Sequence, residues 1–164
     1  MRETIDFDIE YGEEKKNIAH FKITKLSAFD SMPLQFIIKG LFAKTLNGKG
    51  IKDKDLFAAI GGFMEALTYE QFTDIRCRLF TGVKHTGSDV QGKDPIKAYG
   101  SITKSNEQMI FDDELMVYEL FYKALEVNYK RFLGDILRKM ENLFPEVAGK
   151  MKLAITEAKT SMHN

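Results

Sequence analysis

The longest helical pattern in the chain is DDELMVYELFYKALEVNYKRFLGDILRKMENLF, residues 112–144. Its apolar residues recur every three or four positions, which is the spacing of one face of an α-helix. That stripe consists of Leu115, Tyr118, Tyr122, Leu125, Tyr129, Phe132, Ile136, Met140 and Leu143. Asp112 and Asp113 suit a helix start, because their carboxylates accept hydrogen bonds from free backbone N–H groups and favour the positive end of the dipole. The pattern predicts one long helix over 112–144.

Residues 28–82 predict three shorter helices. Apolar spacing indicates a first helix after 28 that Ser31 can cap, and a second helix over about 53–67. A third helix opens with the capping-box pattern Thr68–Gln71, in which two side chains satisfy two helix-start N–H groups. Residues 83–108 are rich in glycine and polar residues and predict a long loop.

Residues 1–25 predict a β-hairpin. Ile5, Phe7 and Ile9 alternate with polar residues, which is the period of a half-buried strand, and a return strand follows over 18–23. The expected fold class is therefore mainly α with a small N-terminal β-hairpin (α+β), a helical bundle around one long central helix. We expect a single globular domain over 1–144 and a C-terminal helical extension over 145–164.

The composition of the 164 residues excludes several classes of protein. Lys and Arg number 24 and Asp and Glu 24, so the formal net charge is zero, which argues against a nucleic-acid binder. A single Cys excludes an internal disulfide and a cysteine zinc site. No apolar run reaches the roughly 18 residues that a membrane span needs, so we expect a soluble, cytoplasmic protein without membrane partners.

The segment Gly87–Lys93 nearly matches a phosphate-binding loop, in which glycine amides surround phosphates and a lysine reaches them. Asp94 stands where a hydroxyl should bind magnesium, and Pro95-Ile96 does not obviously start the required helix. A nucleotide-binding enzyme that uses this loop is one interpretation. The other is an ordinary flexible loop.

Other reactive side chains indicate no catalytic, cofactor-binding or metal site. Cys77 lies between Arg76 and Arg78, and neighbouring cations can activate a thiol, but no His or Asn is close in sequence. Asp6 and Asp8 share a strand face, which is more typical of a solvated surface than of paired catalytic carboxylates. No metal-ligand spacing joins the histidines, His20, His85 and His163.

Aromatic residues gather around the long helix: Phe111, Tyr118, Phe121, Tyr122, Tyr129 and Phe132. A stripe at helical spacing normally faces the core, so a buried core is the first interpretation. The second is that part of this surface binds a partner helix. The large apolar supply is also compatible with a homo-oligomer.

Four stretches together resemble the tail assembly chaperones of tailed bacteriophages and prophages, over about residues 18–134. They are LFAAI at 56–60, LTYEQF at 67–72, the acidic helix start at 112–114 and ALEVNYKRF at 124–132. The resemblance implies a non-enzymatic protein of the bacterial host cytoplasm, without cofactors. It would bind the tape measure protein, a long helical protein that sets tail length, and keep it soluble before tail tube assembly.

A chaperone of this kind needs an apolar surface on its helices. We expect that surface on the first helix and the long helix, near Phe36, Leu41, Phe121 and Phe132. An alternative function is a structural head–tail or tail-tube adaptor of the phage.

Overall fold

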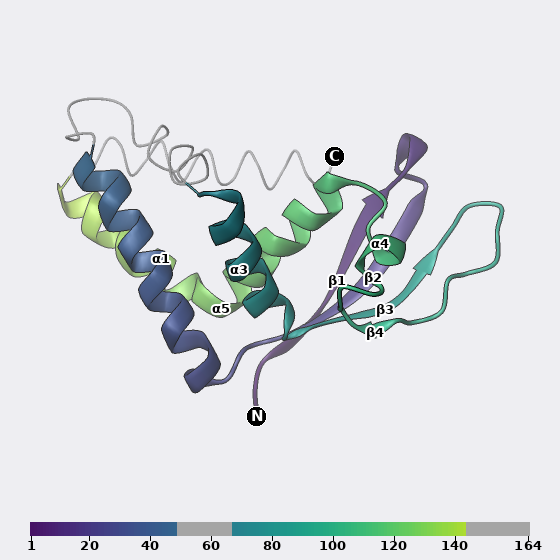
Figure 1. The fold of residues 1–164 in the computed structure, drawn as a ribbon, viewed down its shortest axis with the longest axis horizontal. Coiled ribbons are helices and arrows are strands. Elements are labelled where there is room, and N and C mark those ends of the chain that lie inside the picture. The colour runs from purple at the N-terminus through teal and green to yellow at the C-terminus, as the bar shows by residue number, and fades with distance from the viewer. Residues whose placement is uncertain (49–66, 144–164) are drawn as a thin grey trace. The chain divides into compact units, whose positions relative to one another are not determined.

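The computed structural model describes the backbone of residues 1–48 and 67–143, and the side chains of residues 1–41 and 67–130. The chain divides into two compact units, Met1–Leu34 with Thr73–Tyr129 and Gln35–Phe72 with Lys130–Asn164. The described elements (Figure 1) are, in order, β1 (Thr4–Tyr11), the 3-10 turn η1 (Glu13–Lys15), β2 (Asn17–Thr24), α1 (Ala28–Gly48), α3 (Tyr69–Phe80), β3 (Val83–Asp89), β4 (Gly100–Ser101), α4 (Glu107–Ile110) and α5 (Glu114–Leu143).

The four strands form one antiparallel sheet in the order β1-β2-β3-β4, and the whole sheet lies in the first unit. β1 and β2 pair as a hairpin, with Phe7 opposite Phe21 and Ile9 opposite Ala19. Because side chains alternate between the two faces of a strand, Ala19, Phe21 and Ile23 are all buried on one face of β2. The other face carries the polar residues of the same strands.

The predicted fold class, a mainly α protein bundled around one long central helix, is wrong. The protein is built on a four-stranded antiparallel sheet with helices, and two of the strands lie within 83–108, where we expected a loop. β3 escaped notice because its buried positions after Val83 are His85, Gly87 and Ser88, none of which has a large apolar side chain. A register shift opposite His20 and Phe21 also breaks the two-residue alternation that marks a strand.

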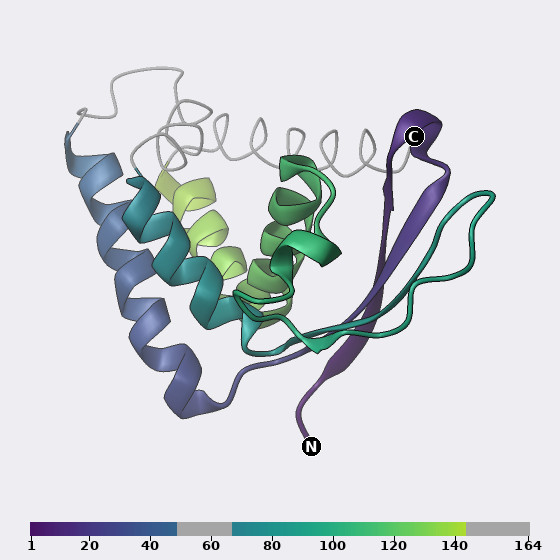
Figure 2. The same ribbon diagram turned by 45° about the vertical axis from the view of Figure 1, so that its right-hand side comes forward.

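The core of the first unit lies between the sheet and its helices. Phe111, just before α5, stacks on Phe21 of β2 and on Phe80 of α3, with ring centroids 6.1 Å apart in both pairs. Lys123 of α5 lies over the Phe7 ring of β1 at 5.8 Å. Phe111 and the first half of α5 therefore contact the apolar face of the sheet, and the end of α3 packs on Phe111; Figure 2 shows these helices on one side of the sheet.

α5 begins two residues after the predicted start, but only part of the predicted stripe is buried: Tyr129 is in the core, and the first residues of the stripe are not. Met116, Leu120 and Ala124 are buried, together with Phe121, whereas Leu115, Tyr118 and Tyr122 are exposed. Asp113 caps the helix, since its carboxylate accepts a hydrogen bond from the Met116 N–H at 3.0 Å. The apolar stripe read from the sequence therefore reaches solvent over the first turns of the helix.

The helix starts follow local side-chain hydrogen bonds. The predicted capping box is confirmed: the Gln71 N–H donates to Thr68 Oγ1 at 3.1 Å, and the Thr68 N–H donates to Gln71 Oε1 at 3.0 Å. At α1 the cap is Ser27 rather than Ser31, because the Asp30 N–H donates to Ser27 Oγ at 3.1 Å. The helix expected over 53–67 and the extension expected over 145–164 lie outside the described residues, apart from Leu67.

Candidate partner-binding surfaces

Three large apolar side chains lie exposed along one side of α5. Leu115 is 69% exposed, and Tyr118 and Tyr122 are each 40% exposed. Their spacing of three and four residues places them on one helix face, which we call the α5 face. The pKa of Tyr122 is raised, by burial first and by Tyr118 second, so its phenol is neutral at physiological pH. The face therefore offers two amphipathic rings and one aliphatic side chain to a partner.

A second exposed apolar face lies on α1. Phe29 is 86% exposed, Phe36 is 69% exposed, and Met32 between them is also exposed. Phe29 and Met32 lie in the first unit, and their spacing places them on one side of the helix, here called the α1 face; Phe36 lies in the second unit. Isolated apolar residues on a surface are ordinary, but a row of them along one helix is typical of an interaction surface.

The four residues expected to bind a partner have different positions. Phe36 is exposed on α1, and Leu41 is half-buried. Phe121 is only 1% exposed, so it belongs to the core. The exposed apolar residues of α5 are instead those of the α5 face. The side chain of Phe132 lies outside the described residues. Exposure on α5 could not be read from the sequence because both sides of this helix are apolar.

The Gly87–Lys93 segment does not have the form of a phosphate-binding loop. Gly87, Ser88 and Asp89 belong to β3, and the Ser88 N–H donates to the Ile96 carbonyl at 3.0 Å. The Lys93 N–H is also engaged, by the Val90 carbonyl at 3.2 Å, and the next described helix begins only at Glu107. The amides of Ser88 and Lys93 are therefore already paired within the protein. Among the side chains of residues 1–41 and 67–130, no group of three His, Cys, Asp or Glu is arranged to hold a metal.

His20 joins three strands on the polar face of the sheet. Its Nδ1 lies 2.7 Å from Asp8 Oδ1 on β1, and its Nε2 lies 2.8 Å from Asp89 Oδ2 on β3. Both ring nitrogens face carboxylates, so the protonated imidazole can donate to both. The hydrogen bonds to Asp8 and then Asp89 raise the pKa of His20. The sequence showed Asp8 as a solvated residue but gave no sign of this bridge to β3.

Stability should depend on pH through His20. Because its folded pKa is raised, its contribution is fully present below the unfolded pKa of about 6.5 and is lost as pH rises through the folded pKa. His85 has the opposite sign, since burial lowers its pKa and its contribution is lost in acid. We therefore compare wild type with His20→Gln, which keeps the burial of His85, the larger cause of its lowered pKa, and removes only the smaller effect of the His20 charge on it. The variant's deficit in urea midpoint should be larger at about pH 5.5 than at about pH 8.5. An equal deficit at both would contradict the bridge.

A comparison with protein families shows to which family the chain that carries these surfaces belongs. The family model described as "Phage tail assembly chaperone protein, TAC" matches residues 17–143. The chain belongs to this family. Its role is that of a chaperone in phage tail assembly, and the resemblance read from the sequence is confirmed. Searches of curated proteins and of solved structures returned no match. None of the helices in the described part of the chaperone is long and apolar enough to cross a membrane.

The ALEVNYKRF segment of the chaperone fixes α5 to the start of α1. The Leu26 N–H donates to Asn128 Oδ1 at 2.8 Å, and Asn128 Nδ2 donates to the Ala124 carbonyl at 2.8 Å. The Tyr129 hydroxyl donates to the Ser31 carbonyl at 3.1 Å, and burial raises the pKa of Tyr129 to about 12. Asn128 and Tyr129 thus hold the fold together rather than face a partner.

Proposed function

We propose that this chaperone binds the tape measure protein in the host cytoplasm and keeps it soluble until the tail tube assembles. Membership of the tail assembly chaperone family supports a role in binding a phage tail protein. The observation that carries the proposal further is the exposure of the α5 face, Leu115, Tyr118 and Tyr122. The same protein buries other apolar residues fully in its core. The α1 face is the second proposed contact.

The chemistry of these faces suits a helical client. A helix that presents apolar residues every three or four positions packs against another apolar helix face by the same spacing. Tyrosines add large contact areas while their hydroxyls stay compatible with water, so the surface remains soluble when the client is absent. Such a surface binds reversibly, as a chaperone that must later release its client requires.

Disruption of the α5 face should abolish most of this binding. Replacing Leu115, Tyr118 and Tyr122 together with serine should reduce co-purification of co-expressed tape measure protein by at least roughly tenfold, because buried aromatic contacts dominate interface energies. The matched control is Glu114→Ser with Lys130→Ser. It changes exposed polar residues of the same helix and leaves the net charge unchanged. Circular dichroism of both variants shows whether the fold is retained.

The outcome separates this proposal from its alternatives. If the wild-type chain neither co-purifies with the tape measure protein nor changes its solubility, the proposal is wrong. If the chain is present in purified virions, a structural adaptor is favoured instead, because a chaperone leaves before assembly is complete. If the control loses binding as fully as the triple variant, the α5 face is not the contact.

A further inference from the structure

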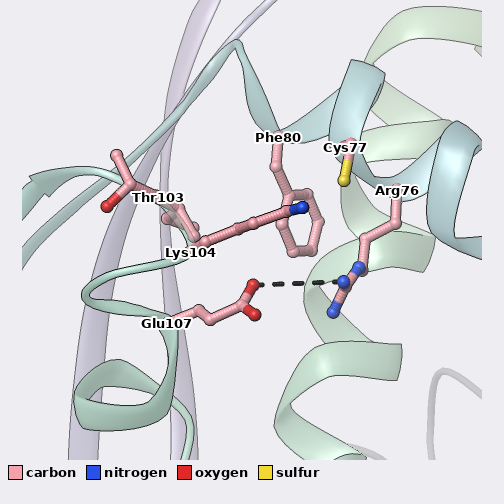
Figure 3. A pocket seen from close by; sticks show the side chains of 7 residues that line it. Arg76, Cys77, Phe80, Thr103, Lys104 and Glu107 are labelled. Carbon is pink, nitrogen blue, oxygen red and sulfur yellow. Dashed lines mark ion pairs between the residues drawn. The ribbon is translucent and has the colours of Figure 1, made fainter.

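A small pocket lies between α3 and the segment that joins β4 to α4, entirely within the first unit. Its volume is about 190 Å³, and it is lined by Arg76, Cys77, Phe80, Ile102, Thr103, Lys104 and Glu107. Figure 3 shows Arg76 and Cys77 entering from α3, and Lys104 and Glu107 from the opposite wall. Phe80 is almost fully buried and forms an apolar wall.

The pocket carries an excess of positive charge. Arg76 and Glu107 form a loose ion pair, with nitrogen and oxygen 3.9 Å apart, and both side chains are partly shielded from solvent. Lys104 is exposed and takes part in none of the ion pairs of the described residues. Two cations and one carboxylate therefore leave one positive charge at an apolar wall.

The size of the pocket limits what can occupy it. Pockets for small molecules usually measure about 300–1,000 Å³, so this one is too small for a typical cofactor or metabolite. It is of the order of a single side chain. A pocket that accepts one side chain of a partner is the usual site of a strong local contact in a protein interface.

We propose that the pocket receives an acidic side chain of the tape measure protein. The inference rests on the proposed function, because it names that partner. The carboxylate would lie between Lys104 and Arg76, and its methylene groups would contact Phe80 and Ile102. Arg76 can serve both Glu107 and the incoming carboxylate, because a guanidinium has five N–H donors. The repulsion from Glu107 is offset by the two cations, and desolvation by the apolar wall strengthens the new ion pairs.

Cys77 provides a direct measure of occupancy, because it is the single cysteine of the chain, it lines the pocket and it is exposed. Its alkylation by iodoacetamide is followed by mass spectrometry of the peptide that contains it, in the free chaperone and in the complex with the tape measure protein. With the partner at about 100 times its Kd, nearly all the chaperone is bound, so the alkylation rate should fall by about tenfold or more.

Lys104→Glu should weaken the complex by about tenfold and remove most of the protection of Cys77, because it places a like charge against the incoming carboxylate. The matched control is Lys97→Glu, which makes the same change of charge at an exposed lysine outside the pocket. In this control, both the affinity of the complex and the protection of Cys77 should be preserved. If the wild-type complex forms but Cys77 reacts as in the free chain, the pocket inference is wrong and the proposed function stands. If Lys104→Glu keeps full protection, the occupant is not acidic. If no complex forms, both proposals fail.

Discussion

Replacing Phe121 with alanine should lower the free energy of unfolding by about 3–5 kcal/mol, the largest effect we expect from any single substitution. The Phe121 ring is 1% exposed and shares the buried side of α5 with Leu120 and Ala124. Its removal forfeits the transfer free energy of the ring and leaves a cavity that close-packed neighbours can fill only in part. Urea unfolding followed by circular dichroism measures the loss as a lower midpoint.

The matched control is Tyr122→Ala, one position along the same helix. Tyr122 is 40% exposed, and its ring contacts Phe121 edge-on at 6.1 Å, so we expect a loss of only about 1 kcal/mol. In binding we expect the opposite order: Tyr122→Ala weakens the complex with the tape measure protein more than Phe121→Ala does. Equal losses of stability would contradict the assignment of the buried face.

The two residues also show how far the sequence of α5 could be read. Its apolar spacing was enough to predict a helix close to the observed Glu114–Leu143. The spacing did not settle the orientation, because the stripe through Leu115, Tyr118 and Tyr122 and the side through Met116, Leu120 and Ala124 are both apolar. Only packing against the sheet distinguishes them. The stripe first interpreted as core is in part the candidate binding surface.

The sheet shows a second limit of prediction from the sequence. β1 and β2 alternate regularly and were predicted as a hairpin, but β3 buries His85 and Ser88, whose side chains satisfy each other at 2.8 Å. A strand whose polar groups are paired internally carries no apolar alternation for a sequence pattern to detect. Contacts between residues far apart in the sequence also leave no local pattern that could predict them. The bridge from His20 to Asp89 and the pocket between α3 and α4 exist only once the sheet has formed.

Asn128→Ala should lower the free energy of unfolding by about 1–3 kcal/mol, because it leaves a part-buried backbone N–H without its acceptor. The group concerned is the Leu26 N–H, which donates to Asn128 Oδ1 at 2.8 Å, and the Leu26 side chain is itself buried. The urea midpoint should fall with an unchanged slope, since the surface exposed on unfolding is nearly the same. Hydrogen exchange of the Leu26 amide should accelerate as well, because that amide loses its hydrogen bond.

The matched control for this prediction is Asn17→Ala. Asn17 Oδ1 also accepts a hydrogen bond from a distant backbone amide, the Gln91 N–H at 3.0 Å, but this bond lies at the surface. Water can replace the lost acceptor there, so we expect a loss below about 1 kcal/mol. A larger loss for Asn17→Ala than for Asn128→Ala would contradict the account. Since Asn128 anchors α5 and does not belong to the α5 face, the folded Asn128→Ala protein should still bind the tape measure protein.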